Sequence, residues 1–190
     1  NVPAPALAQL AKNVRVSPAA DAVAIAQDRA REKAHFQKCG VPVAPYGLIQ
    51  TPMQLAAVGD NLFPGILKTA RMGYDGKGQI RVNNRAELQA AWEQLNKIVC
   101  VLEKRLPLAL ECSVIVARGA DGQCVNLPLQ RNLHRDGILA VTEVYEGNVP
   151  PALAQRAVDA AKTVAAELNY VGVLCVEFFV IDDEEGGRLV

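Results

Sequence analysis

A glycine-rich segment follows a lysine in an apolar stretch, and the two together could bind phosphate. The segment reads GYDGKGQ over residues 73–79, and Lys68 precedes it within GILKTA. Glycines let the backbone approach a phosphate and direct N–H groups at its oxygens. The charge of Lys68 needs a partner if its strand is buried, no acidic residue is near it in sequence, and an anionic ligand would serve. Asp-Gly also favours a hairpin turn, so a plain strand–turn–strand interpretation stays open.

A second group of polar residues follows a strand-like stretch and could bind a nucleoside. The stretch runs into Glu103, Lys104, Arg105 and Leu106, and Glu111 lies on the next predicted strand. Carboxylates accept hydrogen bonds from hydroxyls and exocyclic amines, as a ribose and a base would require. A solvated connection with surface charges is the alternative.

A third polar cluster is expected between two apolar strands. Its members are Arg131, Asn132, His134, Arg135 and Asp136. Such a cluster can hold anions, but it can also be an ordinary loop. The only other histidine, His35, lies in a predicted helix and is expected at the surface.

Glu177 interrupts the apolar stretch VLCVEFFVI. If this stretch is a strand, Cys175, Glu177 and Phe179 share one face. A carboxylate there needs a partner, and Mg²⁺ is suitable because it typically takes one or two carboxylates together with substrate phosphates. A buried salt bridge is the alternative.

The overall composition narrows the classes of partner and compartment. Lys plus Arg equals Asp plus Glu, so no long-range field favours nucleic acid or an anionic membrane. No apolar run approaches the roughly 18 residues of a membrane span, and no signal peptide is visible. The five cysteines form no CxxC pair, which favours buried, reduced thiols in a cytoplasmic protein.

The elements that must position these residues are mixed helices and strands. Strand-rich groups lie before and after about Leu106, without strict βαβα alternation, which predicts an α+β fold with two lobes. Asn84 and Glu87 form a predicted capping pair. Residues 1–16 are expected as a lead-in, and the expected helices cover 17–25, 28–39, 51–58, 84–95 and 150–168. The expected strands lie within 42–50, 64–70, 78–82, 98–106, 110–119, 123–129, 137–147 and 170–181.

Taken together, these stretches resemble the ATP-grasp superfamily, and within it the 5-(carboxyamino)imidazole ribonucleotide synthetases of bacterial purine biosynthesis. The resemblance covers nearly the whole chain and is carried by AQDRAREKAHFQKCGVPVAPY, GYDGKGQ, NLHRDGIL and YVGVLCVEFFV. It implies an ATP-grasp fold, with ATP between two α+β lobes. It also implies a lead-in from a missing Rossmann-like lobe over 1–27, a small lobe with the phosphate loop over 28–98, and a second lobe over 99–190, truncated at its C-terminal end.

The resemblance implies a role for each candidate residue. Lys68 and His134 would be catalytic and would lie at the nucleotide phosphates, and Glu177 would bind Mg²⁺, with Mn²⁺ as a substitute. The remaining residues implied to bind ATP are Arg29, Gly73, Tyr74, Asp75, Gly76, Lys77, Gly78, Gln79, Glu103, Lys104, Arg105, Leu106 and Glu111.

The reaction implied by the resemblance uses ATP, bicarbonate and 5-aminoimidazole ribonucleotide. ATP would phosphorylate bicarbonate to carboxyphosphate with release of ADP, and the amine would take up the carboxyl group with release of phosphate to give N5-carboxyaminoimidazole ribonucleotide. The full-length protein would be a homodimer, and the present chain, expected to be a fragment, would bind ATP weakly and not turn over. Two alternatives stay open: another ATP-grasp ligase, similar to formate-dependent glycinamide ribonucleotide transformylase or biotin carboxylase, and a nucleotide-binding module without catalysis.

Overall fold

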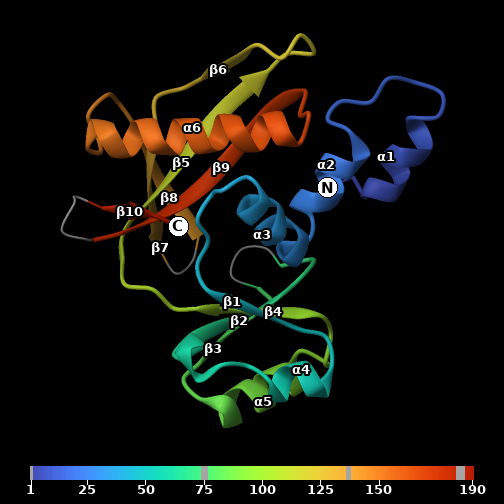
Figure 1. Cartoon of the computed structure of the whole chain (residues 1–190), viewed down its shortest axis with the longest axis vertical. Helices are drawn as coiled ribbons and strands as arrows, with labels where there is room; N and C mark the ends of the chain where they lie inside the picture. Colours follow the sequence, from blue (N-terminus) through green and yellow to red (C-terminus); the bar gives the residue numbers. More distant parts are fainter. Residues whose placement is uncertain (1, 74–76, 136–137, 183–186) are drawn as a thin grey trace.

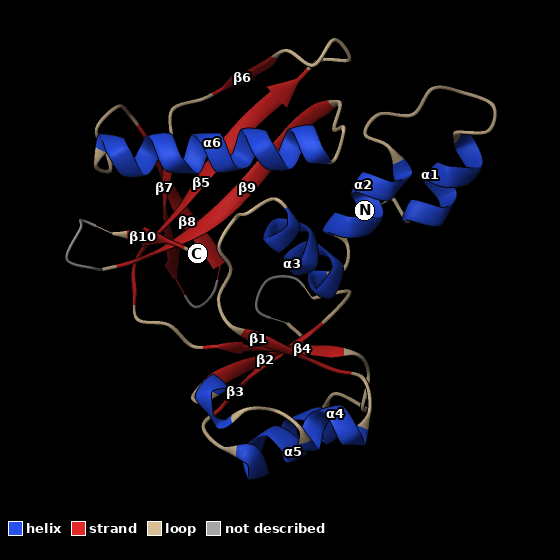
Figure 2. Cartoon of the chain, in the orientation of Figure 1, coloured by secondary structure: helices blue, strands red, loops and turns tan. Residues whose placement is uncertain are grey.

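The computed structural model describes residues 2–73, 77–135, 138–182 and 187–190. Two β-sheets lie one above the other along the long axis, each with its own helices (Figures 1 and 2). The chain leaves the first sheet after Lys104 and enters the second at Leu108, so the division expected near Leu106 is confirmed. The last strand of the first sheet ends at Lys104 and so lies wholly before Leu106. The lobe boundaries expected at 27 and 98 stay predictions.

The first sheet has four strands in the order β1-β4-β2-β3, and all neighbours are antiparallel. Its elements are β1 (Tyr46–Ile49), α4 (Pro52–Ala56), the 3-10 helix η1 (Asp60–Leu62), β2 (Gly65–Thr69), β3 (Gln79–Val82), α5 (Arg85–Gln94) and β4 (Cys100–Lys104). The side chains of Leu67, Leu88 and Leu102 are fully buried between sheet and helices. The Asn84 side chain accepts a hydrogen bond from the Glu87 backbone, so the predicted cap is confirmed.

The second sheet has six strands, with β10-β9-β5-β7-β8 in order and β6 beside β5. Its elements are β5 (Leu108–Arg118), β6 (Cys124–Asn126), β7 (Gln130–Arg135), β8 (Ile138–Val144), α6 (Pro151–Glu167), β9 (Gly172–Ile181) and β10 (Arg188–Leu189). Leu153, Ala157 and Val164 follow helical spacing along α6 and are buried against the sheet. One face of the sheet is therefore apolar and covered by α6, which leaves the other face for polar side chains.

Three helices precede the first sheet: α1 (Ala4–Leu10), α2 (Ala20–Ala26) and α3 (Arg29–Lys38). Helix α1 was not predicted within the lead-in, and it packs against α2. The Asp28 carboxylate caps α3 by accepting hydrogen bonds from the backbone of Ala30 and Arg31. In Figure 1, α3 lies between the two sheets, where its side chains can reach both.

Two expectations about burial are wrong, one for His35 and one for the cysteines. His35 is buried rather than at the surface, with its ring 3.4 Å from the Cys39 thiol. The thiols are not uniformly buried either: Cys100 and Cys112 are inside, whereas Cys175 is exposed. Helical periodicity alone could not place His35, because the packing of α3 against other elements decides which of its faces is covered.

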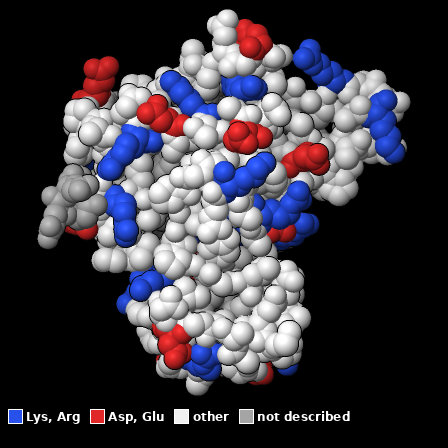
Figure 3. Space-filling model, viewed as in Figure 1, with Lys and Arg blue, Asp and Glu red and all other residues white. Residues whose placement is uncertain are grey.

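Basic and acidic side chains are interspersed over the face shown in Figure 3. Among the helices of the described residues, none combines the length and apolar character needed to cross a bilayer.

Candidate functional site

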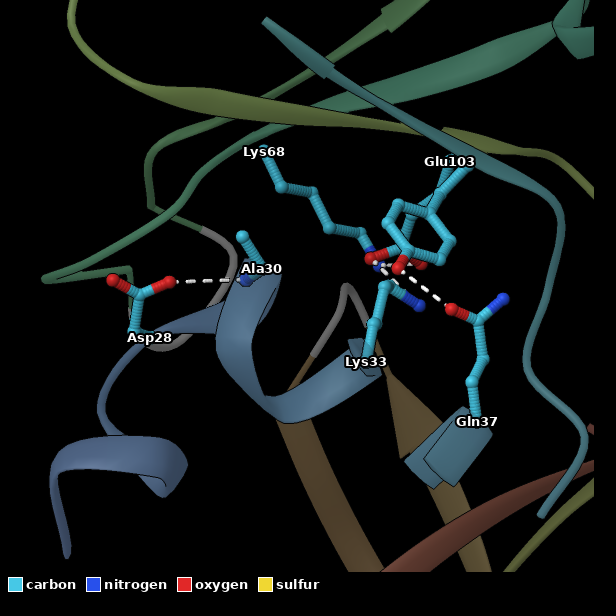
Figure 4. A network of polar contacts seen from close by, with 7 residues as sticks. Asp28, Ala30, Lys33, Gln37, Lys68 and Glu103 are labelled. Carbon is cyan, nitrogen blue, oxygen red and sulfur yellow. Dashed lines mark hydrogen bonds and ion pairs between the residues drawn. The ribbon is translucent and has the colours of Figure 1, made fainter. Parts of the chain in front are cut away.

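Lys68, Glu103 and Lys33 form a buried ion cluster beside the glycine-rich hairpin (Figure 4). In the antiparallel pair β2–β4, Glu103 lies opposite Ile66, so Lys68 is its diagonal neighbour on the same face. The Lys68 Nζ lies 2.9 Å from Glu103 Oε2, and the Lys33 Nζ on α3 lies 3.4 Å from Glu103 Oε1. No acidic residue is near Lys68 in sequence, but in the fold its partner is Glu103, which lies 35 residues further along the chain.

The cluster carries one net positive charge in a poorly solvated place. The side chains of Lys33, Lys68 and Glu103 are only 12%, 15% and 8% exposed. Burial alone would raise the pKa of Glu103, but the ammonium groups of Lys68 and then Lys33 outweigh it and hold that pKa below its ordinary value. Burial lowers the pKa of Lys33, and Glu103 partly offsets this. An anion that reaches Lys68 would meet a cation already stripped of most of its water.

The glycine-rich segment joins two antiparallel strands, β2 and β3. Lys68 pairs with Gln79 across β2 and β3, and the Thr69 N–H donates to the Gly78 carbonyl at 2.8 Å. Gly78 has a φ of 72°, and a Cβ there would lie 2.7 Å from the Thr69 hydroxyl oxygen. The two paired strands of the strand–turn–strand interpretation are confirmed, whereas phosphate binding stays a prediction. The predicted phosphate-binding residues at positions 74–76 (Tyr74, Asp75 and Gly76) lie outside the described residues.

The start of α3 is fixed beside this hairpin. The Arg29 backbone N–H donates to the Ala70 carbonyl at 2.9 Å, and the Arg71 Nε lies 2.8 Å from the Asp28 carboxylate. Burial would raise the pKa of Asp28, but the hydrogen bond and charge of Arg71 and the hydrogen bonds from the Arg31 and Ala30 backbone together outweigh it and lower that pKa. A Cβ added to Gly73 would lie 3.5 Å from an Arg29 guanidinium nitrogen, so Arg29 is close to the glycine-rich segment, and its role at the nucleotide stays a prediction.

Two residues of this region, Glu32 and Lys33, were missed by the sequence interpretation. Burial raises the pKa of Glu32; Arg29 and Lys33 oppose the rise, and Glu103 and Glu177 add to it. Glu32 thus lies within electrostatic range of charged groups on both sheets. The signal that could have found both is spacing, because they follow Arg29 by three and four residues and share its helix face.

The second sheet presents its polar face with Glu177 on it. Cys175, Glu177 and Phe179 alternate with the buried Val176 and Phe178, as predicted for a strand. Glu177 itself is exposed, so the alternative of a buried salt bridge is wrong. No group of three or more His, Cys, Asp or Glu side chains within the described ranges is arranged to hold a metal ion.

Four members of the polar cluster expected between strands lie instead within β7, namely Arg131, Asn132, His134 and Arg135, and the fifth, Asp136, lies outside the described residues. Residues 131–135 pair with β5, β8 or both, so their backbone groups form hydrogen bonds within the sheet. Asn132 lies opposite Glu111 and donates to the Ser113 hydroxyl at 3.0 Å. His134 Nδ1 lies 2.9 Å from Glu111 Oε2, in a close contact that is not aligned as a hydrogen bond. The predicted phosphate and ribose residues are thus neighbours on one sheet face.

Residues 103–106 form the passage from the first sheet to the second. The Lys104 and Arg105 N–H groups donate to the carbonyls of Pro45 and Pro64, both at 2.9 Å. Glu103 is buried and Arg105 is exposed, so this stretch is only partly the solvated connection of the alternative. A cavity of about 300 Å³ between the end of α3, α6 and β10 is lined by none of the predicted nucleotide residues.

Comparison with known proteins gives a family match and close relatives. The family described as ATP-grasp domain matches residues 34–186. The chain is 38% identical over 186 residues to the N5-carboxyaminoimidazole ribonucleotide synthase of Pseudomonas aeruginosa, covering 96% of this chain and 50% of that protein. It is 40% identical over 190 residues to the synthase of the same name from Brucella melitensis, covering 96% and 51%.

Solved structures of such synthases match the whole chain. An ADP complex of N5-carboxyaminoimidazole ribonucleotide synthetase aligns with a TM-score of 0.88 and 34% identity, over 100% of this chain and 50% of that one. The Aspergillus clavatus enzyme, in complex with ADP and 5-aminoimidazole ribonucleotide, aligns with a TM-score of 0.84 and 28% identity over the same shares. The chain therefore spans about half the length of the relatives it matches.

Proposed function

The chain belongs to the ATP-grasp family, and we propose that it is the ATP-binding core of an enzyme that carboxylates 5-aminoimidazole ribonucleotide with bicarbonate. The observation that carries the proposal is the likeness, over the full chain, to a synthase in complex with ADP and that ribonucleotide. The identity of 38–40% to curated synthases supports the same reaction.

In this proposal, ATP lies between the two sheets, with its phosphates at the hairpin. Lys68 and Arg29 supply positive charge, the backbone of 73–79 folds over the phosphates, and His134 lies at their other side. The hydrophilic edge of the base meets residues 103–106, and Glu111 accepts hydrogen bonds from the ribose. The net positive cluster around Lys68, and the approach of Arg29 to the glycine-rich segment, support this orientation.

Glu177 would be the ligand that this chain contributes to Mg²⁺, or to Mn²⁺ in its place. Its exposed carboxylate suits a hard cation that shares its ligands with phosphates. When bound, the metal ion would offset the negative charge of the phosphate oxygens.

The chain's own groups would then act by positioning and charge neutralisation. Lys68 would stabilise the charge on the transferred phosphoryl group as bicarbonate becomes carboxyphosphate. Coverage by the hairpin would exclude water from that intermediate until the amine of the ribonucleotide takes up the carboxyl group. The homodimer and the cytoplasmic location implied by the resemblance belong to this proposal as well.

The test is ADP release by the full-length protein that carries this chain, with ATP, Mg²⁺ and bicarbonate. Release should increase on addition of 5-aminoimidazole ribonucleotide and should be lost in Lys68→Ala. ADP release that does not change with this ribonucleotide but increases with another acceptor would make the protein a different ATP-grasp ligase. ATP binding without hydrolysis, whatever the acceptor, would make it a nucleotide-binding module. Robust product formation by the 190-residue chain alone would refute the expectation that it does not turn over.

A further inference from the structure

We infer that Lys33 is a positioning residue that holds Glu103 in place while Lys68 turns from Glu103 to an anionic ligand. The inference rests on the proposed nucleotide site, because it assumes that Lys68 meets phosphate. It starts from the division of the carboxylate: Oε2 contacts Lys68 at 2.9 Å, whereas Oε1 contacts Lys33 at 3.4 Å. Each oxygen has its own cation, so one contact can break while the other stays.

The burial of the cluster makes this second contact important. The Glu103 side chain is only 8% exposed, and an unpaired carboxylate is strongly disfavoured in such a place. A phosphate that competes for Lys68 would otherwise leave Glu103 without a cation. With Lys33 present, the carboxylate keeps a partner and Lys68 is free to exchange.

Lys33 is also fixed in a way that suits a stationary partner. Its ammonium lies 5.4 Å from the centre of the Tyr46 ring, which favours a cation through the face of the ring. The Tyr46 hydroxyl donates to Gln37 one turn further along α3, at 3.0 Å. Helix α3 and β1 therefore hold Lys33 from two sides, and Figure 4 shows its side chain directed at Glu103.

The consequence is a coupling between Lys33 and Glu103 in nucleotide binding. Without Lys33, Lys68 is the one cation left in contact with Glu103 among the described residues, so a phosphate must break that pair and affinity falls. If Glu103 is also made neutral, Lys68 is no longer held and the loss of Lys33 should have little effect. If Lys33 contacted phosphate directly, its removal would weaken nucleotide binding equally whether Glu103 is charged or has been made neutral.

The experiment measures the Kd of ADP by calorimetry in the full-length protein that carries this chain. Lys33→Met should raise the Kd about tenfold, and the same change in a Glu103→Gln background should alter it less than about twofold. Lys33→Arg should restore most of the affinity. Lys38→Met is the matched control, because Lys38 lies on the same helix but is 73% exposed.

Three results would overturn the inference. An equal loss of affinity in both backgrounds would make Lys33 a direct phosphate ligand. A lower melting temperature with an unchanged Kd would make its role structural only. A wild-type protein that binds no ADP would refute the nucleotide site itself, whereas ADP binding without acceptor-stimulated turnover would leave this inference standing and remove only the proposed reaction.

Discussion

Removal of the Glu103 carboxylate should destabilise the first sheet more than removal of either lysine. Truncating one member of a buried ion pair costs about 3–5 kcal/mol, because the other charge stays buried without a partner. Glu103→Ala leaves two ammonium groups that are only 12% and 15% exposed, and their partial access to water places the cost near the lower end, at about 3 kcal/mol. Lys68→Met leaves Glu103 paired with Lys33, so we expect about 1–2 kcal/mol.

Urea unfolding followed by tryptophan fluorescence measures this difference. Trp92 is the only tryptophan, is buried in the core of the first sheet, and donates to the Ile98 carbonyl at 2.9 Å, so its emission reports on this lobe. With a slope of about 2 kcal/mol per molar, Glu103→Ala should lower the midpoint by about 1.5 M. The double variant Glu103→Ala/Lys68→Met should be less destabilised than the sum of the two single variants. Additive effects, or a loss below about 1 kcal/mol for Glu103→Ala, would refute the argument.

Three further perturbations test other parts of the structure. The pKa of Glu103 is lower in the folded protein than its ordinary 4.5. The stability advantage of the wild-type protein over Glu103→Gln should therefore be constant from neutral pH to about 4.5 and disappear below it. Urea titrations across this pH range would show the change. Gly78→Ala should cost about 2 kcal/mol and Gly40→Ala about 1 kcal/mol in thermal melts, because both have a φ near 70° but a Cβ meets a neighbour only at Gly78; equal losses would contradict this. The exposed Cys175 should react with a thiol reagent in the native protein, whereas burial raises the pKa of Cys112 to about 12 and should protect it until unfolding.

Several local features could be predicted because neighbours in the chain determine them. The Asn84 and Glu87 cap, the buried stripe of α6 and the alternation around Glu177 all depend on helical or strand periodicity and on capping chemistry. The resemblance carried by the glycine-rich segment also led to the family that the comparisons show.

Other features were wrong or missed because distant segments decide them. The polar stretch of β7 became a strand since β5 and β8 supply hydrogen-bond partners on both sides, which no propensity of its own residues indicates. His35 is buried because of how α3 packs, and α1 forms against α2 in a stretch expected to be a lead-in.

The local pattern of residues predicts that Lys68 lies on a strand before a glycine-rich segment and that Glu103 lies near the end of another strand. That these two residues are partners, and that Lys33 joins them, depends on how the elements pack. The physical reason is that the register of β2 against β4 brings Lys68 and Glu103 together across 35 residues, and that the docking of α3 adds the second ammonium. Register and docking are set by the burial of whole faces, which is a property of the assembled sheet and helices and not of any single segment.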